Sequence, residues 1–406
     1  MPISFKNLSR LQFARFAVAL LLLVGAVSLT GCGDVYRSIA TPVTSPGGDP
    51  QATHYALVIS QGNLPAAGSV AQIDVSGDTN LLNRSVGVNP VFAAFSGGIG
   101  TAWIVNHDES TVSTFSPSFS GGSASSISLE QNSGPTYVAL GGTVAVVNEP
   151  NLNKVAILSA GQNLANAFVP VGVLPIAITV TPDGKKAFVA NNGDNTVTVV
   201  STVENNVIGS PIPVGAKPID LTIQGAGAFA YLISQAGNSL SVIDTTTNTE
   251  VQRVTTGLSA PSRVFWDENL KRVYVVNGGA NSITIYNASN PGQLVFLKTV
   301  TTAAPPIGLA VLDNGSKFYV LHAGTPGTVE VFDALSFALR TTITVQNNPT
   351  SIAAAPGSTK IFVANKTGDP NTPALASGSI SIIKSLDESV LNISPAGPNP
   401  VFVITQ

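Results

Sequence analysis

The sequence predicts an all-β protein, a β-propeller built from four-stranded antiparallel blades. Three observations support this fold. Short β-branched runs alternate with turn residues along the chain, no long helical period is visible, and one four-run pattern recurs with a period in the low forties. A single four-stranded sheet cannot bury both of its faces alone, so repetition around a ring is the expected solution.

The clearest copy of the pattern covers residues 175–217. Its four apolar runs are 176–181, 186–191, 196–202 and 207–214, and they are separated by 182–184, 192–195 and 204–206, which are rich in Pro, Asp, Asn and Gly. Turns of this composition between β-branched runs are typical of hairpins, so the segment predicts a four-stranded meander.

A proline opens the first run of each copy and marks the period. The spacings between successive prolines are 45, 40, 43, 43, 45, 43 and 51 residues, and the prolines are Pro90, Pro135, Pro175, Pro218, Pro261, Pro306, Pro349 and Pro400. The second runs begin at residues 54, 101, 143, 186, 228, 272, 317 and 360, which predicts eight blades. Seven blades is the alternative, and it would require one of these sets to be something other than a blade.

The two ends of the pattern complement each other. The first copy starts directly at a second run, with His54, and has no opening proline. Residues 399–406 read NPVFVITQ and match the NPVF that opens the second copy at Asn89. The last run is therefore expected to supply the innermost strand of the first blade, which closes the ring and removes open sheet edges.

The first 53 residues are expected to direct and tether the protein. Residues 1–31 combine three basic side chains with an apolar run of twelve residues, 16–27, which is typical of a signal peptide. Residues 29–32, Leu-Thr-Gly-Cys, resemble the lipobox of bacterial lipoproteins, which implies cleavage before Cys32 and lipidation of its thiol. Residues 32–53 are rich in Pro, Gly, Ser and Thr and predict a flexible tether, which leaves 54–406 for the propeller.

The lipobox implies a location in the cell envelope, with Cys32 as the contact to the membrane. In Gram-negative lipoproteins an Asp directly after the lipidated cysteine favours the inner membrane. Gly33 stands there in this chain, with Asp34 one residue later, so the resemblance favours the outer membrane. The alternative is an ordinary secreted protein in which Cys32, the sole cysteine, is an incidental free thiol.

The repeat VANNGDNTVTVV, preceded by PDGKKAFV, resembles the YVTN family of β-propeller repeats. The resemblance is closest at 175–217 and covers 54–406 in looser form. Related propellers include a lactonase-like group, so the resemblance implies the fold together with either binding or lactone hydrolysis, and it does not decide between them.

Composition excludes several functional classes. Charged residues make up 10% of the chain and the net charge is −3, which leaves no basic stripe for nucleic acid. The chain has no Cys-x-x-Cys-His for haem attachment, and no phosphate loop, dinucleotide fingerprint or nucleophile elbow follows a predicted strand. The sequence therefore predicts no cofactor and identifies no catalytic residue.

Polar residues that follow the second strands are the candidate ligand-binding face. In a propeller, these positions from all blades lie on one side of the disc, around the channel. We expect this face to be formed by His107, Asp108, Glu149, Asn192, Asp194, His322 and Lys366. Two histidines with a carboxylate would suit a divalent metal, whereas the alternative is that both are solvated turn residues.

The residue types at this face are mixed, which favours a binding or scaffold module for a protein, glycan or small ligand. A lactonase-like hydrolase with a site at the channel mouth is the alternative. Several acidic and histidine residues at equivalent second-strand ends would favour that enzyme. The eight residues at those ends are mixed instead: Gln61, His107, Glu149, Asn192, Gln235, Gly278, His322 and Lys366.

Overall fold

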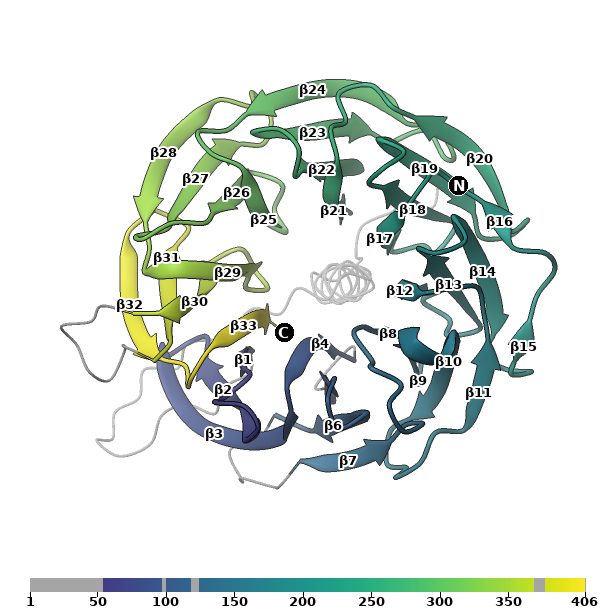
Figure 1. The fold of residues 1–406 in the computed structure, drawn as a ribbon. Coiled ribbons are helices and arrows are strands. Elements are labelled where there is room, and N and C mark those ends of the chain that lie inside the picture. The colour runs from purple at the N-terminus through teal and green to yellow at the C-terminus, as the bar shows by residue number, and fades with distance from the viewer. Residues whose placement is uncertain (1–53, 97–99, 118–123, 369–376, 406) are drawn as a thin grey trace, which may run out of the picture. The chain divides into compact units, whose positions relative to one another are not determined.

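The described residues between 54 and 405 form eight sheets arranged in a ring (Figure 1). The computed structural model describes residues 54–96, 100–117, 124–368 and 377–405, so the predicted signal peptide, Cys32 and the tether lie outside the described residues. We number the blades 1 to 8 in chain order. The prediction of eight four-stranded antiparallel blades is confirmed.

The strands of blades 1 to 4, from the channel outward, are as follows. Blade 1 contains β33 (Pro400–Thr405), β1 (Tyr55–Ser60), β2 (Ala67–Asp74) and β3 (Thr79–Val88). Blade 2 contains β4 (Pro90–Phe95), β5 (Ala102–Asn106), β6 (Thr111–Phe115) and β7 (Ser125–Ser128). Blade 3 contains β8 (Val138–Gly141), β9 (Val144–Glu149), β10 (Lys154–Ser159) and β11 (Ala167–Pro170), with the 3-10 turn η1 (Pro150–Leu152) after β9. Blade 4 contains β12 (Pro175–Val180), β13 (Lys186–Asn191), β14 (Thr196–Ser201) and the short β15 (Asn206–Val207) and β16 (Ile212–Pro213), which both pair with β14.

The remaining blades repeat the same order. Blade 5 contains β17 (Pro218–Ile223), β18 (Phe229–Ser234), β19 (Ser239–Asp244) and β20 (Thr249–Val254). Blade 6 contains β21 (Pro261–Asp267), β22 (Arg272–Asn277), β23 (Ser282–Asn287) and β24 (Val295–Thr301). Blade 7 contains β25 (Pro306–Val311), β26 (Lys317–His322), β27 (Thr328–Asp333) and β28 (Leu339–Thr344). Blade 8 contains β29 (Asn347–Ala354), β30 (Lys360–Thr367), β31 (Ser379–Lys384) and β32 (Val390–Pro395).

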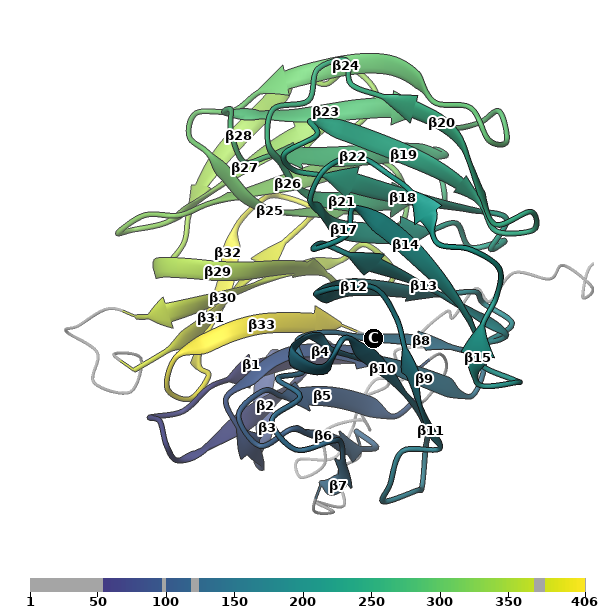
Figure 2. The same cartoon turned by 45° about the vertical axis from the view of Figure 1, so that its right-hand side comes forward.

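Blade 1 is shared between the two ends of the described chain. β33 pairs antiparallel with β1, with Val403 opposite Val58 and Thr405 opposite Ala56. Figure 2 shows β33 beside β1 and β4. The predicted completion of the first blade by the last strand is therefore confirmed.

The core lies between neighbouring blades. The second and third strands are buried almost throughout; in β13 and β14 every residue but the first is buried. The outer strands are more exposed; in β20, exposed and half-buried side chains alternate. A strand covered on both faces needs a continuous apolar run, and an outer strand facing solvent on one side does not. Among the described residues, no helix is long and apolar enough to span a membrane.

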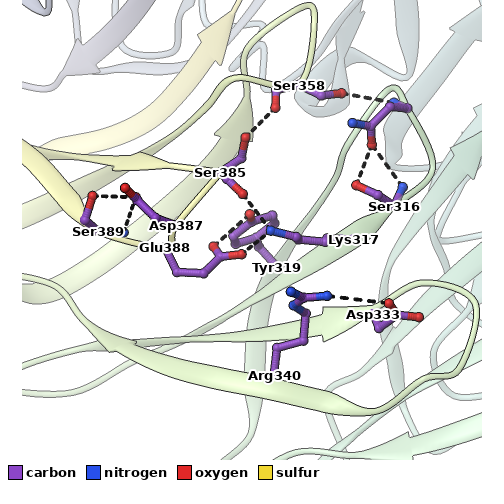
Figure 3. Close-up of polar contacts among 11 residues, drawn as sticks. Ser316, Lys317, Tyr319, Asp333, Arg340, Ser358, Ser385, Asp387, Glu388 and Ser389 are labelled. Carbon is purple, nitrogen blue, oxygen red and sulfur yellow. Dashed lines mark hydrogen bonds and ion pairs between the residues drawn. The ribbon is translucent and has the colours of Figure 1, made fainter.

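A cation at the start of a second strand repeatedly joins one blade to the next. Lys186 Nζ donates to the Thr245 carbonyl at 2.9 Å, and Lys360 Nζ donates to the Val75 carbonyl at 2.6 Å. Figure 3 shows the copy between blades 7 and 8, where Lys317 contacts the Ser385 carbonyl at 2.6 Å.

The Lys317 contact between blades 7 and 8 also involves a carboxylate. Lys317 forms an ion pair with Glu388, and Tyr319 Oη donates to Glu388 Oε2 at 2.9 Å (Figure 3). Both charged side chains are largely buried, so these polar contacts fix how the two blades sit against each other.

Candidate functional site in the central channel

A bulge follows the opening proline in seven of the eight first strands. The proline pairs with a residue at or near the end of the second strand, the next residue is skipped, and the one after it resumes the pairing. In blade 6, for example, Pro261 is opposite Asn277 and Arg263 is opposite Val276. Bulges bend a strand and redirect its side chains, and they often occur next to active sites.

One position per blade therefore recurs around the channel, two residues after the proline. Its occupants, from blade 1 to blade 8, are Phe402, Phe92, Tyr137, Ala177, Asp220, Arg263, Gly308 and Ser351. In blade 3 the register differs, because Tyr137 lies just before β8 and Val138 takes up the pairing. All of these residues except Ala177 line a cavity of about 340 Å³ in the channel.

Aromatic side chains from blades 1 to 3 form one wall of the cavity. The rings of Phe92 and Tyr137 stack with centroids 4.0 Å apart and an interplanar angle of 24°. The ring of Phe402 lies 4.7 Å from that of Phe92, tilted by 35°. The three rings therefore form a continuous apolar surface contributed by both ends of the propeller.

A carboxylate and a guanidinium come from blades 5 and 6. Asp220 is only 7% exposed, and its carboxylate accepts hydrogen bonds from the Leu221 N–H at 3.1 Å and the Val264 N–H at 3.0 Å. Burial raises the pKa of Asp220 to about 6, and the positive charge of Arg263 opposes that shift. Asp220 thus joins two inner strands and titrates near neutral pH.

Arg263 is exposed within the channel. No described residue forms a hydrogen bond or ion pair with its guanidinium. Burial raises the pKa of the Tyr137 phenol, with Asp220 adding to the shift and Arg263 opposing it, so these three side chains act on one another across the cavity. Arg263 is the charged group that remains available to a ligand.

The part of the cavity wall between Arg263 and the aromatic rings is formed by small residues from blades 7 and 8. Gly308 lines the cavity without a side chain, and Ser351 Oγ accepts a hydrogen bond from the Val403 N–H at 3.3 Å. That bond is equivalent to the one between Asp220 and Val264, because both link neighbouring inner strands. The cavity therefore has an aromatic side, a charged side and a side formed by the small residues Gly308 and Ser351.

Most residues of the sequence-predicted face are engaged in bonds that hold the loops. His107 Nδ1 lies 2.6 Å from Asp108 Oδ1, and that carboxylate also accepts from Asn89 Nδ2 at 3.0 Å. These two hydrogen bonds lower the pKa of Asp108. Asn192 Nδ2 donates to the Pro218 carbonyl at 3.0 Å, and Asp194 accepts from the Val173 N–H at 2.5 Å. Lys366 is exposed, and a role of this face in ligand binding stays a prediction.

Glu149 and His322 do not lie on the open face. Glu149 is fully buried, and its Oε1 accepts the Glu130 N–H at 3.1 Å. Burial raises the pKa of Glu149 to about 7. His322 is the last residue of β26 and pairs with Pro306, so it occupies the position held by Asn191 in blade 4 rather than the turn after the strand.

His322 forms a buried pair with Glu330, at 2.9 Å between Nε2 and Oε2. In blades 2, 4, 6 and 8 this place is held by an asparagine that donates to a hydroxyl, as from Asn191 to Thr198 at 2.8 Å. The two imidazoles considered as metal ligands are therefore in different settings, one exposed and one inside a blade. Within the described ranges, no group of three or more His, Cys, Asp or Glu side chains could hold a metal ion.

The sequence analysis missed the channel residues, although a signal was present. Asp220 and Arg263 are charged residues at the same distance from the prolines that open their strands. Aromatic residues fill that position in three blades that are consecutive once the ring is closed. Aligning the first strands as the second strands were aligned would have brought them together.

No protein-family model and no curated protein matches the chain. Solved structures do resemble it. The dihydro-heme d1 dehydrogenase NirN, solved in complex with DHE, matches with a TM-score of 0.69 and 12% identity over 90% of this chain and 78% of that one. AztD from Citrobacter koseri matches with a TM-score of 0.65 and 14% identity over 88% of this chain and 98% of that one.

A proposed 6-phosphogluconolactonase from Bacteroides fragilis matches with a TM-score of 0.57 and 16% identity over 74% of this chain and 98% of that one. At such identities the similarity shows the propeller fold alone. Because one fold supports many functions, the site must carry the functional argument.

Proposed function

We propose that this chain is a binding module that captures a small molecule in its central channel. The observation that carries the proposal is the aromatic wall of Phe402, Phe92 and Tyr137 together with an unpaired guanidinium, that of Arg263, in one cavity. Ligand sites are typically concave and largely apolar, with a few polar groups that fix orientation. The volume of about 340 Å³ suits a small ligand rather than a polymer.

Capture of a protein or glycan on the loop face, the surface that the sequence predicted from the residues after the second strands, is the weaker alternative. Asp108, Asn192 and Asp194 already accept or donate bonds within the loops, so a partner there would compete with contacts that hold the fold. In the channel, a ligand could bind Arg263 without breaking hydrogen bonds that hold the fold.

A lactonase-like hydrolase is the second candidate, because the raised pKa of Asp220, about 6, suits a general base near neutral pH. Both carboxylate oxygens of Asp220 accept main-chain N–H groups, which favours a structural role over water activation. Hydrolysis of a lactone by the wild type but not by Asp220→Asn would support the enzyme instead.

Filling the cavity tests the proposal. Gly308→Phe places a phenyl group where blades 1 and 2 already carry Phe402 and Phe92, and Gly308 does not have the left-handed backbone that would forbid a side chain. A Cβ there would lie 3.2 Å from Ile352 Cγ2, so the Ile352 side chain must shift slightly to accept the new ring. We expect wild type to bind the neutral probe 2-naphthylmethanol at one saturable site in calorimetric titration, and Gly308→Phe to lose that binding.

Thr246→Phe is the matched control, since it adds the same ring in an exposed turn of blade 5. It should bind the probe as wild type does, and circular dichroism should show all three proteins folded. Equal binding by all three would place the site outside the channel and contradict the proposal.

We further propose that the protein is held at a membrane, with the outer membrane favoured, through a lipid on Cys32. Lys6, Arg10 and Arg15 before the apolar run, and the lipobox after it, support this. One acyl chain binds a membrane marginally, whereas several chains anchor stably.

Cys32→Ser should release the protein from membranes or leave it unprocessed, as measured by fractionation and by labelling with a radioactive fatty acid. Ser45→Ala, in the predicted tether, should remain anchored. A mature, lipid-labelled Cys32→Ser protein in the membrane fraction would refute the anchor.

A further inference from the structure

We infer that the channel selects small anions with a planar apolar body, the anionic oxygen atoms on Arg263 and the body against Phe402, Phe92 and Tyr137. This inference rests on the proposed function and adds the chemical class of the ligand. The inference depends on the fact that Arg263 is exposed in the channel, whereas Asp220 is buried.

The accessible charge in the channel is positive. Arg263 is exposed and no described residue bonds to its guanidinium, whereas Asp220 is 7% exposed and each of its oxygens already accepts an N–H. A guanidinium presents paired donors that match the two oxygens of a carboxylate. A cationic ligand would instead be repelled by Arg263, and both carboxylate oxygens of Asp220 already accept main-chain hydrogen bonds.

The opposite wall favours a flat apolar body. The three rings are packed with centroids 4.0 and 4.7 Å apart, and stacked aromatic contacts add to the gain from burying area. Gly308 and Ser351 leave room between this wall and Arg263, so one molecule can reach both. The cavity of about 340 Å³ lies within the size range of small-ligand pockets, about 300–1,000 Å³, which suits a fused two-ring carboxylate.

Anion binding should be coupled to a proton on Asp220. The charged or titratable groups that face Asp220 are Arg263 on β21 and Tyr137 beside β8. An anion on Arg263 brings a negative charge toward Asp220 and offsets the guanidinium, so the bound state favours the protonated carboxyl. The free protein already holds this pKa near 6, so affinity should rise as the pH falls from 8 to 5.5, while a carboxylate ligand stays ionised.

Three probes of one shape test the inference on the full-length protein by calorimetric titration: 2-naphthoate, 2-naphthylmethanol and 2-naphthylmethylammonium. We expect wild type to bind the carboxylate about tenfold or more tightly than the alcohol, the usual scale of a charge-assisted contact. Arg263→Gln should remove that preference, so that the carboxylate and the alcohol bind with similar affinities. Arg340→Gln removes a charge at the rim of blade 7 and should change neither affinity.

The pH profile separates an anion site from a merely structural Arg263. Binding of 2-naphthoate should weaken from pH 5.5 to 8 in wild type and become nearly independent of pH in Asp220→Asn. If the alcohol or the ammonium probe binds as tightly as the carboxylate, and Gly308→Phe still blocks it, the anion inference is wrong while channel binding stands. If wild type binds none of the probes, both proposals fall.

Discussion

Deleting residues 400–406 should make the protein aggregate or lose cooperative folding. The deletion removes β33, the inner strand of blade 1, which pairs with β1 from Ala56 to Ser60. All six residues of β1 are buried, so the deletion would expose an apolar strand with unpaired backbone groups, which pairs readily with other chains. We expect a loss comparable with the whole stability of a typical domain, about 5–15 kcal/mol.

The deletion would also remove one wall of the cavity, because Phe402 stacks on Phe92 and the Val403 N–H donates to Ser351. Thermal melts and sedimentation of the deleted and full chains provide the measurement. Phe402→Leu is the control that keeps the strand, and it should stay monodisperse with a modest drop in melting temperature. A deleted chain that melts like the full one would refute the shared blade.

Replacing His322 by Ala should destabilise the fold by about 1–3 kcal/mol, the usual cost of leaving a buried polar group without one of its hydrogen-bond partners. Glu330 is 3% exposed and would lose the 2.9 Å contact to His322, keeping the Ala303 N–H at 3.1 Å. Chemical denaturation measures the loss.

A double substitution tests the reason for that loss. His322→Asn with Glu330→Thr recreates the pair found in blade 6, where Asn277 donates to Thr284 at 3.0 Å. The double variant should be more stable than His322→Ala and than Glu330→Thr alone, because residues in contact couple. A double variant as unstable as the worse single one would show that blade 7 requires the His–Glu pair itself.

The repeat period and turn chemistry were sufficient to predict the blades and the closure by β33, because each strand's apolar run and each proline lie at regular places. The site was harder, because it depends on register within a strand. A bulge after Pro218 or Pro261 decides which side chain reaches the channel, and a bulge leaves no mark in composition. The predicted face assumed that polar residues after second strands are free for ligands.

The structure shows why that assumption failed for particular residues. Glu149 caps a neighbouring main-chain N–H, and His322 belongs to the strand end rather than to the turn. An offset of one residue in the alignment of blade 7 was enough to move His322 from a buried pair to an expected open face. Patterns of polarity predict which residues are near a loop, but only the backbone register shows whether a side chain is already bonded.

A crystal structure of the full-length protein with bound 2-naphthoate would show directly whether the channel is the ligand site. We expect its rings against Phe402, Phe92 and Tyr137, with its carboxylate within hydrogen-bonding distance of the Arg263 guanidinium, in the cavity bounded by Gly308. The probe bound on the loop face near His107 and Lys366, or on the outer strands, with water alone in the channel, would contradict this prediction.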